Sequence, residues 1–99
     1  MAGMIDPKLA TAIRKGKPED KNVHAAFTLR NDGKGKALTP ERTDEIVRDI
    51  IGRVSRETAK AVGKVVVFKN LQSFSVDAPA TLVEKLADED AVSTAALGS

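Results

Sequence analysis

The 99-residue chain contains no cysteine, tryptophan or tyrosine, and it has only three phenylalanines and one histidine. The absence of cysteine excludes disulfides, thiol nucleophiles and cysteine-ligated metals. No apolar run approaches the roughly 20 residues that a bilayer-spanning helix needs. The first residues lack a basic stretch followed by an apolar one, so no signal peptide is visible and a cytoplasmic protein is the default expectation.

Neither sign of charge dominates the chain, because the formal net charge is only +2. Residues 1–36 carry eight Lys or Arg against four Asp or Glu, whereas residues 37–99 carry eight against ten. The basic excess falls largely in RKGKPEDK and RNDGKGK, whose Gly, Pro and charge are typical of solvated loops. Weak phosphate binding by these loops stays open, but the pattern argues against a dedicated nucleic-acid site.

Residues 1–22 are interpreted as an N-terminal lead-in that precedes a folded domain of residues 23–97. Within the lead-in, Asp6 suits a helix cap and Pro7 suits the first turn. Ile5, Leu9 and Ile13 follow at four-residue spacing, which predicts a short helix over residues 7–14.

The segment NVHAAFTLR, residues 22–30, alternates between apolar and mainly small or polar side chains and predicts a half-buried strand. The loop NDGKGK follows, and then Thr39 and Pro40 start a long helical pattern that can end at Gly63. Gly52 and Ser55 leave room for a kink or break within this helix.

Two further strands, KVVVFKN and QSFSVD, are separated by a short connection and should form an antiparallel hairpin. Asp77 is then expected to cap a helix whose buried side is Leu82, Val83 and Leu86. The segment AVSTAAL predicts a last strand.

The predicted order is strand, helix, strand, strand, helix, strand. It indicates an α+β protein with the ferredoxin-like βαββαβ fold, in which an antiparallel four-stranded sheet carries two helices on one face. The other face would be open and lined by small or polar side chains: His24, Ala26, Thr28, Ser73, Ser75, Ser93 and Ala95. Such a face can accept another protein's helices or can be plain solvated surface.

All three phenylalanines are assigned to the core: Phe27 and Phe74 by alternation, and Phe68 by its neighbour Val66. The open face is therefore expected to carry no bulky anchor. It also lacks the aromatic platform on which RNA-recognition domains stack bases.

Residues with catalytic or metal-binding potential are few. His24 has no sequence neighbour that would make it a metal ligand or a general base, and it is interpreted as a solvated or interface histidine. NDGKGK lacks the spacing of a dinucleotide or triphosphate loop, and the consecutive acids Asp88, Glu89 and Asp90 point in different directions. We therefore expect a protein that is not an enzyme and has no cofactor or metal.

Residues 65–92, VVVFKNLQSFSVDAPATLVEKLADEDAV, resemble the propeptides of subtilisin-like serine proteases and their free-standing inhibitor relatives. Phe74, Ser75 and Val76 match the Phe-Ser-Ala/Val element of that family, and Leu86 and Val92 match its Leu…Val pair. The resemblance covers about a third of the chain. The first strand and helix agree with the family only in order.

The resemblance implies a ferredoxin-like domain that binds a subtilisin-like protease, inhibits it and assists its folding. The open sheet face would pack on two helices of the enzyme, and the C-terminal tail would lie in the active-site cleft like a cleaved product. Docking residues would then be His24, Ala26, Thr28, Ser73, Ser75 and Ser93.

Two features depart from the family pattern. The last strand of the family usually carries acidic residues that meet helix N-termini of the protease. This chain has Thr94, Ala95 and Ala96 at the corresponding positions. Family members also continue for several residues beyond this strand. Either the inhibitory tail is absent, or Ala95, Ala96 and Leu97 themselves form the substrate-like end.

Two other functions remain open from the sequence. One is a non-inhibitory interaction or self-assembly domain of the same fold, and the other is a weak nucleic-acid binder. Protease binding, concentration-dependent oligomers and salt-dependent oligonucleotide binding would distinguish the three.

Overall fold

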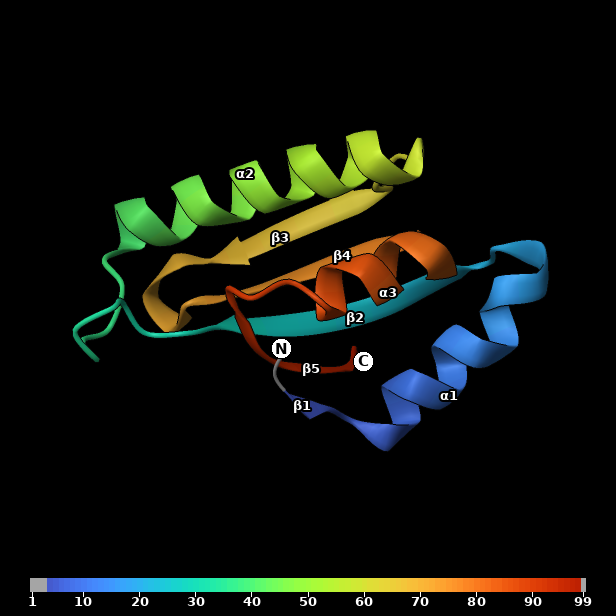
Figure 1. Ribbon diagram of the computed structural model, residues 1–99, viewed down its shortest axis with the longest axis horizontal. Helices are drawn as coiled ribbons and strands as arrows, with labels where there is room; N and C mark the ends of the chain where they lie inside the picture. Colours follow the sequence, from blue (N-terminus) through green and yellow to red (C-terminus); the bar gives the residue numbers. More distant parts are fainter. Residues whose placement is uncertain (1–3, 99) are drawn as a thin grey trace.

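A computed structural model of the chain describes residues 4–98 and has an α+β architecture (Figure 1). Residues 1–3 of the N-terminal lead-in and residue 99 lie outside the described part. The elements along the chain are β1 (Met4–Ile5), α1 (Pro7–Gly16), the 3-10 helix η1 (Lys17–Glu19), β2 (Asn22–Leu29), α2 (Pro40–Thr58), β3 (Lys64–Phe68), the 3-10 helix η2 (Lys69–Leu71), β4 (Ser73–Pro79), α3 (Ala80–Ala87) and β5 (Val92–Leu97).

The strands form one five-stranded mixed sheet in the order β1-β5-β2-β4-β3. β2, β3, β4 and β5 pair antiparallel, but β1 runs parallel to β5, with Met4 opposite Thr94 and Ile5 opposite Ala95. The expectation of a four-stranded antiparallel sheet is therefore wrong in strand number and direction. The added strand pairs with the edge of β5 that would otherwise be free, and so protects it.

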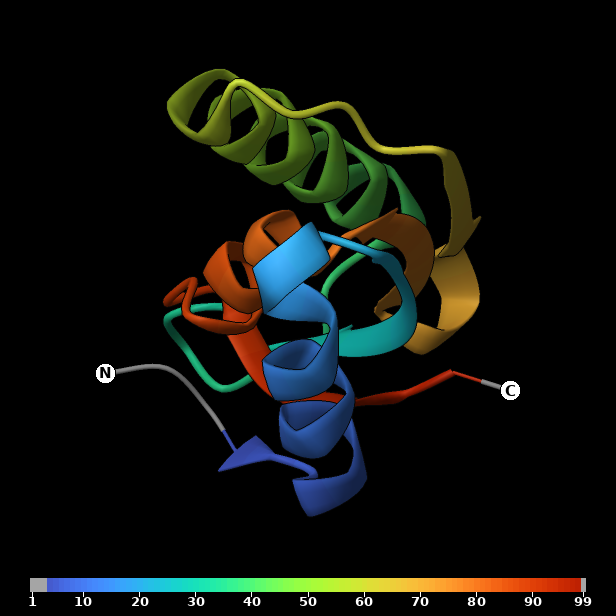
Figure 2. The same cartoon turned by 90° about the vertical axis from the view of Figure 1, so that its right-hand side faces the viewer.

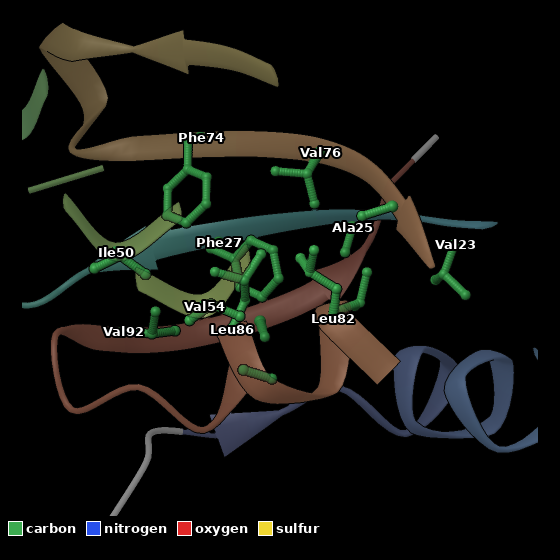
Figure 3. Close-up of a cluster of buried hydrophobic side chains, with 14 of the residues drawn as sticks. Val23, Ala25, Phe27, Ile50, Val54, Phe74, Val76, Leu82, Leu86 and Val92 are labelled. Carbon is green, nitrogen blue, oxygen red and sulfur yellow. The ribbon is translucent and has the colours of Figure 1, made fainter. Parts of the chain in front are cut away.

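α2 and α3 lie on the same side of β3 and β4 (Figure 2). Between them and the sheet lies the core, shown in Figure 3, to which β2 contributes Val23, Ala25, Phe27 and Leu29 as predicted. The rings of Phe27 and Phe74 stack with centroids 5.0 Å apart at an interplanar angle of 23°. Burial of both rings and this contact stabilise the pairing of β2 with β4.

α1 begins at Pro7 as predicted and extends two residues beyond the expected end. Leu9 and Ile13 are buried in the same core as the strands, so the helix of the lead-in packs against the domain. Asp6 occupies the N-cap position but its side chain makes no capping bond. Its backbone N–H instead donates to the Ala95 carbonyl at 2.8 Å, which joins the start of α1 to β5.

α2 starts as predicted, with the Thr39 hydroxyl accepting a hydrogen bond from the Arg42 N–H at 3.1 Å. It passes through Gly52 without a break and ends at Thr58, where Ala59 adopts a left-handed conformation with φ 55°. The expected end at Gly63 is wrong. The Gly63 N–H already donates to the Asp77 carbonyl at 2.7 Å, so the residues after Thr58 are needed to reach the sheet.

The N-terminus of α3 is capped by a residue distant in sequence. Asp77 lies within β4, whereas the Thr81 N–H donates to Asp20 Oδ1 at 2.9 Å and the Thr81 hydroxyl bonds the same oxygen. Lys60 Nζ lies 3.0 Å from the other Asp20 oxygen. Hydrogen bonds from Thr81 and from Lys60 lower the pKa of Asp20 to about 2. The expected Asp77 cap is therefore wrong, because that residue pairs with β2 and β3 instead.

A second ion pair joins α2 to the turn after α3. Arg53 Nη2 lies 2.6 Å from the Glu89 carboxylate. The hydrogen bond and the attraction of this carboxylate raise the pKa of Arg53. The acidic turn that follows α3 thus has a partner on α2 and is more than a solvated helix end.

Candidate docking face

The helix-free side of the sheet, called the outer face below, consists of three rows of side chains that the strand register aligns. Side chains alternate along each strand, so the neighbours of the core-facing residues in β2 and β4 point to this side. The residues of the outer face are His24, Ala26, Thr28, Lys64, Val66, Phe68, Ser73, Ser75, Asp77, Thr94 and Ala96.

The middle row is made of small side chains with one larger residue at the β3 end. Val66 lies opposite Ser75, Ser75 opposite Ala26, and Ala26 opposite Ala96. Ser75 is only 8% exposed although it points away from the core. The neighbouring side chains on β2 and β3 shield Ser75 because its own side chain is short. The surface of the outer face is therefore recessed at this position.

The second row runs from Phe68 through Ser73 and Thr28 to Thr94. Phe68 is 45% exposed, so the expectation that all three phenylalanines belong to the core is wrong. The physical reason is its position opposite Ser73, which places the ring on the outer face at the edge of the sheet. Because Val66 is also 37% exposed, the outer face does carry bulky apolar side chains, contrary to expectation.

The third row contains the single histidine. His24 Nδ1 lies 2.6 Å from Asp77 Oδ1 across the β2–β4 pair, and Lys64 lies opposite Asp77 on β3. The carboxylate therefore orients the imidazole ring on the outer face. No hydroxyl of residues 4–98 is hydrogen-bonded to this ring, so the pair as described lacks the nucleophile of a hydrolytic triad.

Ala95 does not occupy the outer-face position expected of it, and Ser93 lies at an irregularity of the strand pairing. Leu29 pairs with Val92 and Thr28 pairs with Thr94, so the register shifts and Ser93 has no opposite residue on β2. Such an extra residue reverses the alternation that follows it. Ala95 consequently faces the core and is 2% exposed, and Thr94 and Ala96 take the outer positions.

The three residues proposed as a substrate-like tail are part of the sheet. Ala95, Ala96 and Leu97 pair with Phe27, Ala26 and Ala25 of β2, respectively. The Gly98 N–H continues this contact by donating to the His24 carbonyl at 2.8 Å. To reach a protease cleft, these residues would have to leave β2.

The chemistry of the described residues can be stated briefly. Residues 4–98 contain no group of three or more His, Cys, Asp or Glu side chains placed to hold a metal ion. In the same part of the chain, no helix is long and apolar enough to cross a membrane. Apart from His24, the outer-face positions of β2 and β4 hold no ring on which a base could stack.

No family model, no curated protein and no solved structure matches this chain.

Proposed function

We propose that this chain is a ferredoxin-like docking domain that acts as a propeptide-like inhibitor or folding partner of a subtilisin-like serine protease. The observation that carries the proposal is the outer face, where a low row of small side chains is bordered by the exposed Val66 and Phe68. The sequence resemblance of residues 65–92 supplies the class of partner.

The fold assignment rests on β2 to β5 and the helices between them. Their order along the chain is strand, helix, strand, strand, helix, strand, and their order in the sheet is β5-β2-β4-β3. Both agree with a split βαβ arrangement in which β1 is an addition.

Docking on helices suits the shape of the outer face. Packed helices approach most closely where the facing side chains are small. Ala26, Ser75 and Ala96 would allow such an approach along the middle row. Val66 and Phe68 would supply the larger apolar contacts that carry most of the binding energy at an interface.

Docking and inhibition are separate parts of the proposal. Docking needs only the outer face, whereas a substrate-like role of Ala95, Ala96 and Leu97 requires the end of β5 to leave β2. We therefore expect residues 4–98 to bind a cognate protease at concentrations at which they do not yet inhibit its active site.

The test is binding of the chain to a panel of subtilisin-like proteases, followed by the variants Ser75→Arg and Thr28→Arg. A long charged side chain on the outer face should weaken binding at least tenfold, because it holds the enzyme away from the sheet and buries a charge. Ala10→Arg is the matched control, since Ala10 is exposed on α1. Retained thermal stability must accompany the loss of binding.

Equal binding by parent, Thr28→Arg and Ser75→Arg would refute docking through this face. Binding to no protease in the panel, together with oligomers that form with increasing concentration, would favour the second candidate, a self-assembly domain. That candidate has its own support in the exposed Val66 and Phe68, because apolar groups on one face can also pack against a second copy.

A further inference from the structure

β3 is the last strand of the sheet order, and no strand of residues 4–98 pairs with its other side. None of its five residues is buried. Val65 and Val66 are 39% and 37% exposed although β-branched residues of this kind usually fill a sheet interior. The opposite edge is different, because β1 has only two residues and offers little backbone for pairing.

A cation stands at each end of this edge. Lys64 begins β3 and Lys69 follows its last residue, and both side chains are exposed. Neither ammonium group has an acidic partner within residues 4–98. The nearest acid in register with Lys64 is Asp77, whose carboxylate is bonded to His24.

A hollow of about 380 Å³ lies at the end of the strand. It is lined by Val67, Phe68, Lys69, Asn70 and Leu71. Leu71 is 68% exposed, so the hollow has an apolar wall that an entering side chain could cover. An added strand gains affinity from backbone hydrogen bonds and selectivity from such side-chain sites.

We propose that the free edge of β3 binds an extended, acidic segment of another protein as an additional strand. The segment would carry acidic residues near Lys64 and Lys69 and an apolar residue over the hollow beside η2. This proposal does not rest on protease docking, because it needs the backbone along the free edge of β3, although Lys64 and Phe68 also belong to the outer face.

Charge argues against a second copy of the chain as the occupant. Antiparallel pairing of two β3 strands would bring Lys64 of one copy near Lys69 of the other at both ends. Like charges on neighbouring strands destabilise the pairing, and no acid at this edge offsets them. Lysines at a sheet edge commonly prevent such self-pairing.

The experiment titrates the intact chain with a synthetic peptide of about seven residues, alternating Val and Thr with Glu at both ends. Amide NMR signals of residues 64–69 should shift, and a peptide with Lys in place of Glu should bind about tenfold more weakly at low salt. The double variant Lys64→Glu/Lys69→Glu should reverse this preference. Both positions are exposed, and an unchanged thermal unfolding curve verifies that the fold is retained.

A Glu-ended peptide with N-methyl groups along one edge is the control for backbone pairing, and it should not bind. Equal binding of the Glu-ended and Lys-ended peptides, or no binding of either, would overturn the proposal. Dimerisation with increasing concentration that shifts the amide signals of residues 64–69, without peptide binding, would overturn it in favour of a second copy. Loss of protease docking in Thr28→Arg with peptide binding intact would show that the two surfaces are distinct.

Discussion

β3 and β4 form one hairpin, yet the more apolar strand is the more exposed one. β3 reads KVVVF and has no buried residue, whereas β4 reads SFSVDAP and buries Phe74, Ser75, Val76 and Ala78. β4 lies between two strands and β3 lies at the edge of the sheet. Position in the sheet therefore outweighs side-chain hydrophobicity in deciding which residues the helices and neighbouring strands cover.

The largest effect should come from removing the aromatic ring of each strand in turn. Phe74 is fully buried and stacked on Phe27, so Phe74→Ala should cost about 3–5 kcal/mol of unfolding free energy. Phe68→Ala should cost about 1 kcal/mol or less because the ring is 45% exposed. Urea unfolding monitored by circular dichroism measures both, and similar costs would contradict the difference between the strands.

A smaller effect is expected from placing a hydroxyl in the valine pair Val65 and Val76, which lie opposite one another. Val76 is 1% exposed, so Val76→Thr should cost about 1–3 kcal/mol through an unpaired buried hydroxyl. Val65→Thr should change the unfolding free energy by about 0.5 kcal/mol at most. A substantial loss in Val65→Thr would mean that β3 is covered in solution.

The cap of α3, the helix that directly follows β4 in the chain, should make stability depend on pH. The pKa of Asp20 is about 2 in the folded chain against an ordinary value of 3.8. A carboxylate with a lowered pKa contributes stability above its ordinary pKa, and this contribution is lost as the pH falls from about 4 to about 2. Thermal unfolding of Asp20→Asn should show a lower Tm at pH 7 and a smaller decrease over this pH range.

Thr81→Ala is the matched control for that cap, because it removes the hydroxyl that bonds Asp20 but keeps the backbone N–H. It should lower the Tm by less than Asp20→Asn does. An acid profile of Asp20→Asn that parallels the parent between pH 4 and pH 2 would exclude Asp20 as the responsible group.

The smallest effect should arise where β5 ends beside β2. A Cβ added at Gly98 would overlap His24 Cδ2, so Gly98→Ala must displace either the ring or the strand end. We expect altered NMR signals of the imidazole and loss of its bond to Asp77, with little change in Tm. Unchanged imidazole signals would show that the end of β5 moves instead.

Several elements were predictable because their patterns are local. The alternation of β2, the Thr39 cap and the apolar side of α3 at Leu82, Val83 and Leu86 each depend on residues a few positions apart. The periodicities of helices and strands express such short-range relations in the sequence.

Other features depend on contacts between distant residues and leave little local trace. β1 forms because Met4 and Ile5 pair with β5, which is distant in the sequence. The cap of α3 comes from Asp20, which accepts a hydrogen bond from Thr81 although the two residues are 61 positions apart. Because Ser93 has no opposite residue on β2, Ala95 faces the core and not the outer face as expected. A single extra residue in a strand cannot be recognised from alternation when its neighbours are Ser, Thr and Ala.

The sequence by itself determined an α+β chain with a strand at residues 22–29, a helix from Pro40, and a hairpin followed by a helix, because these follow from periodicity and capping. Only the tertiary structure decided that Phe68 and Val66 lie on the outer face and that β3 has a free edge. Burial of a strand depends on which strands and helices stand beside it, and strand order is not encoded in the strand's own pattern.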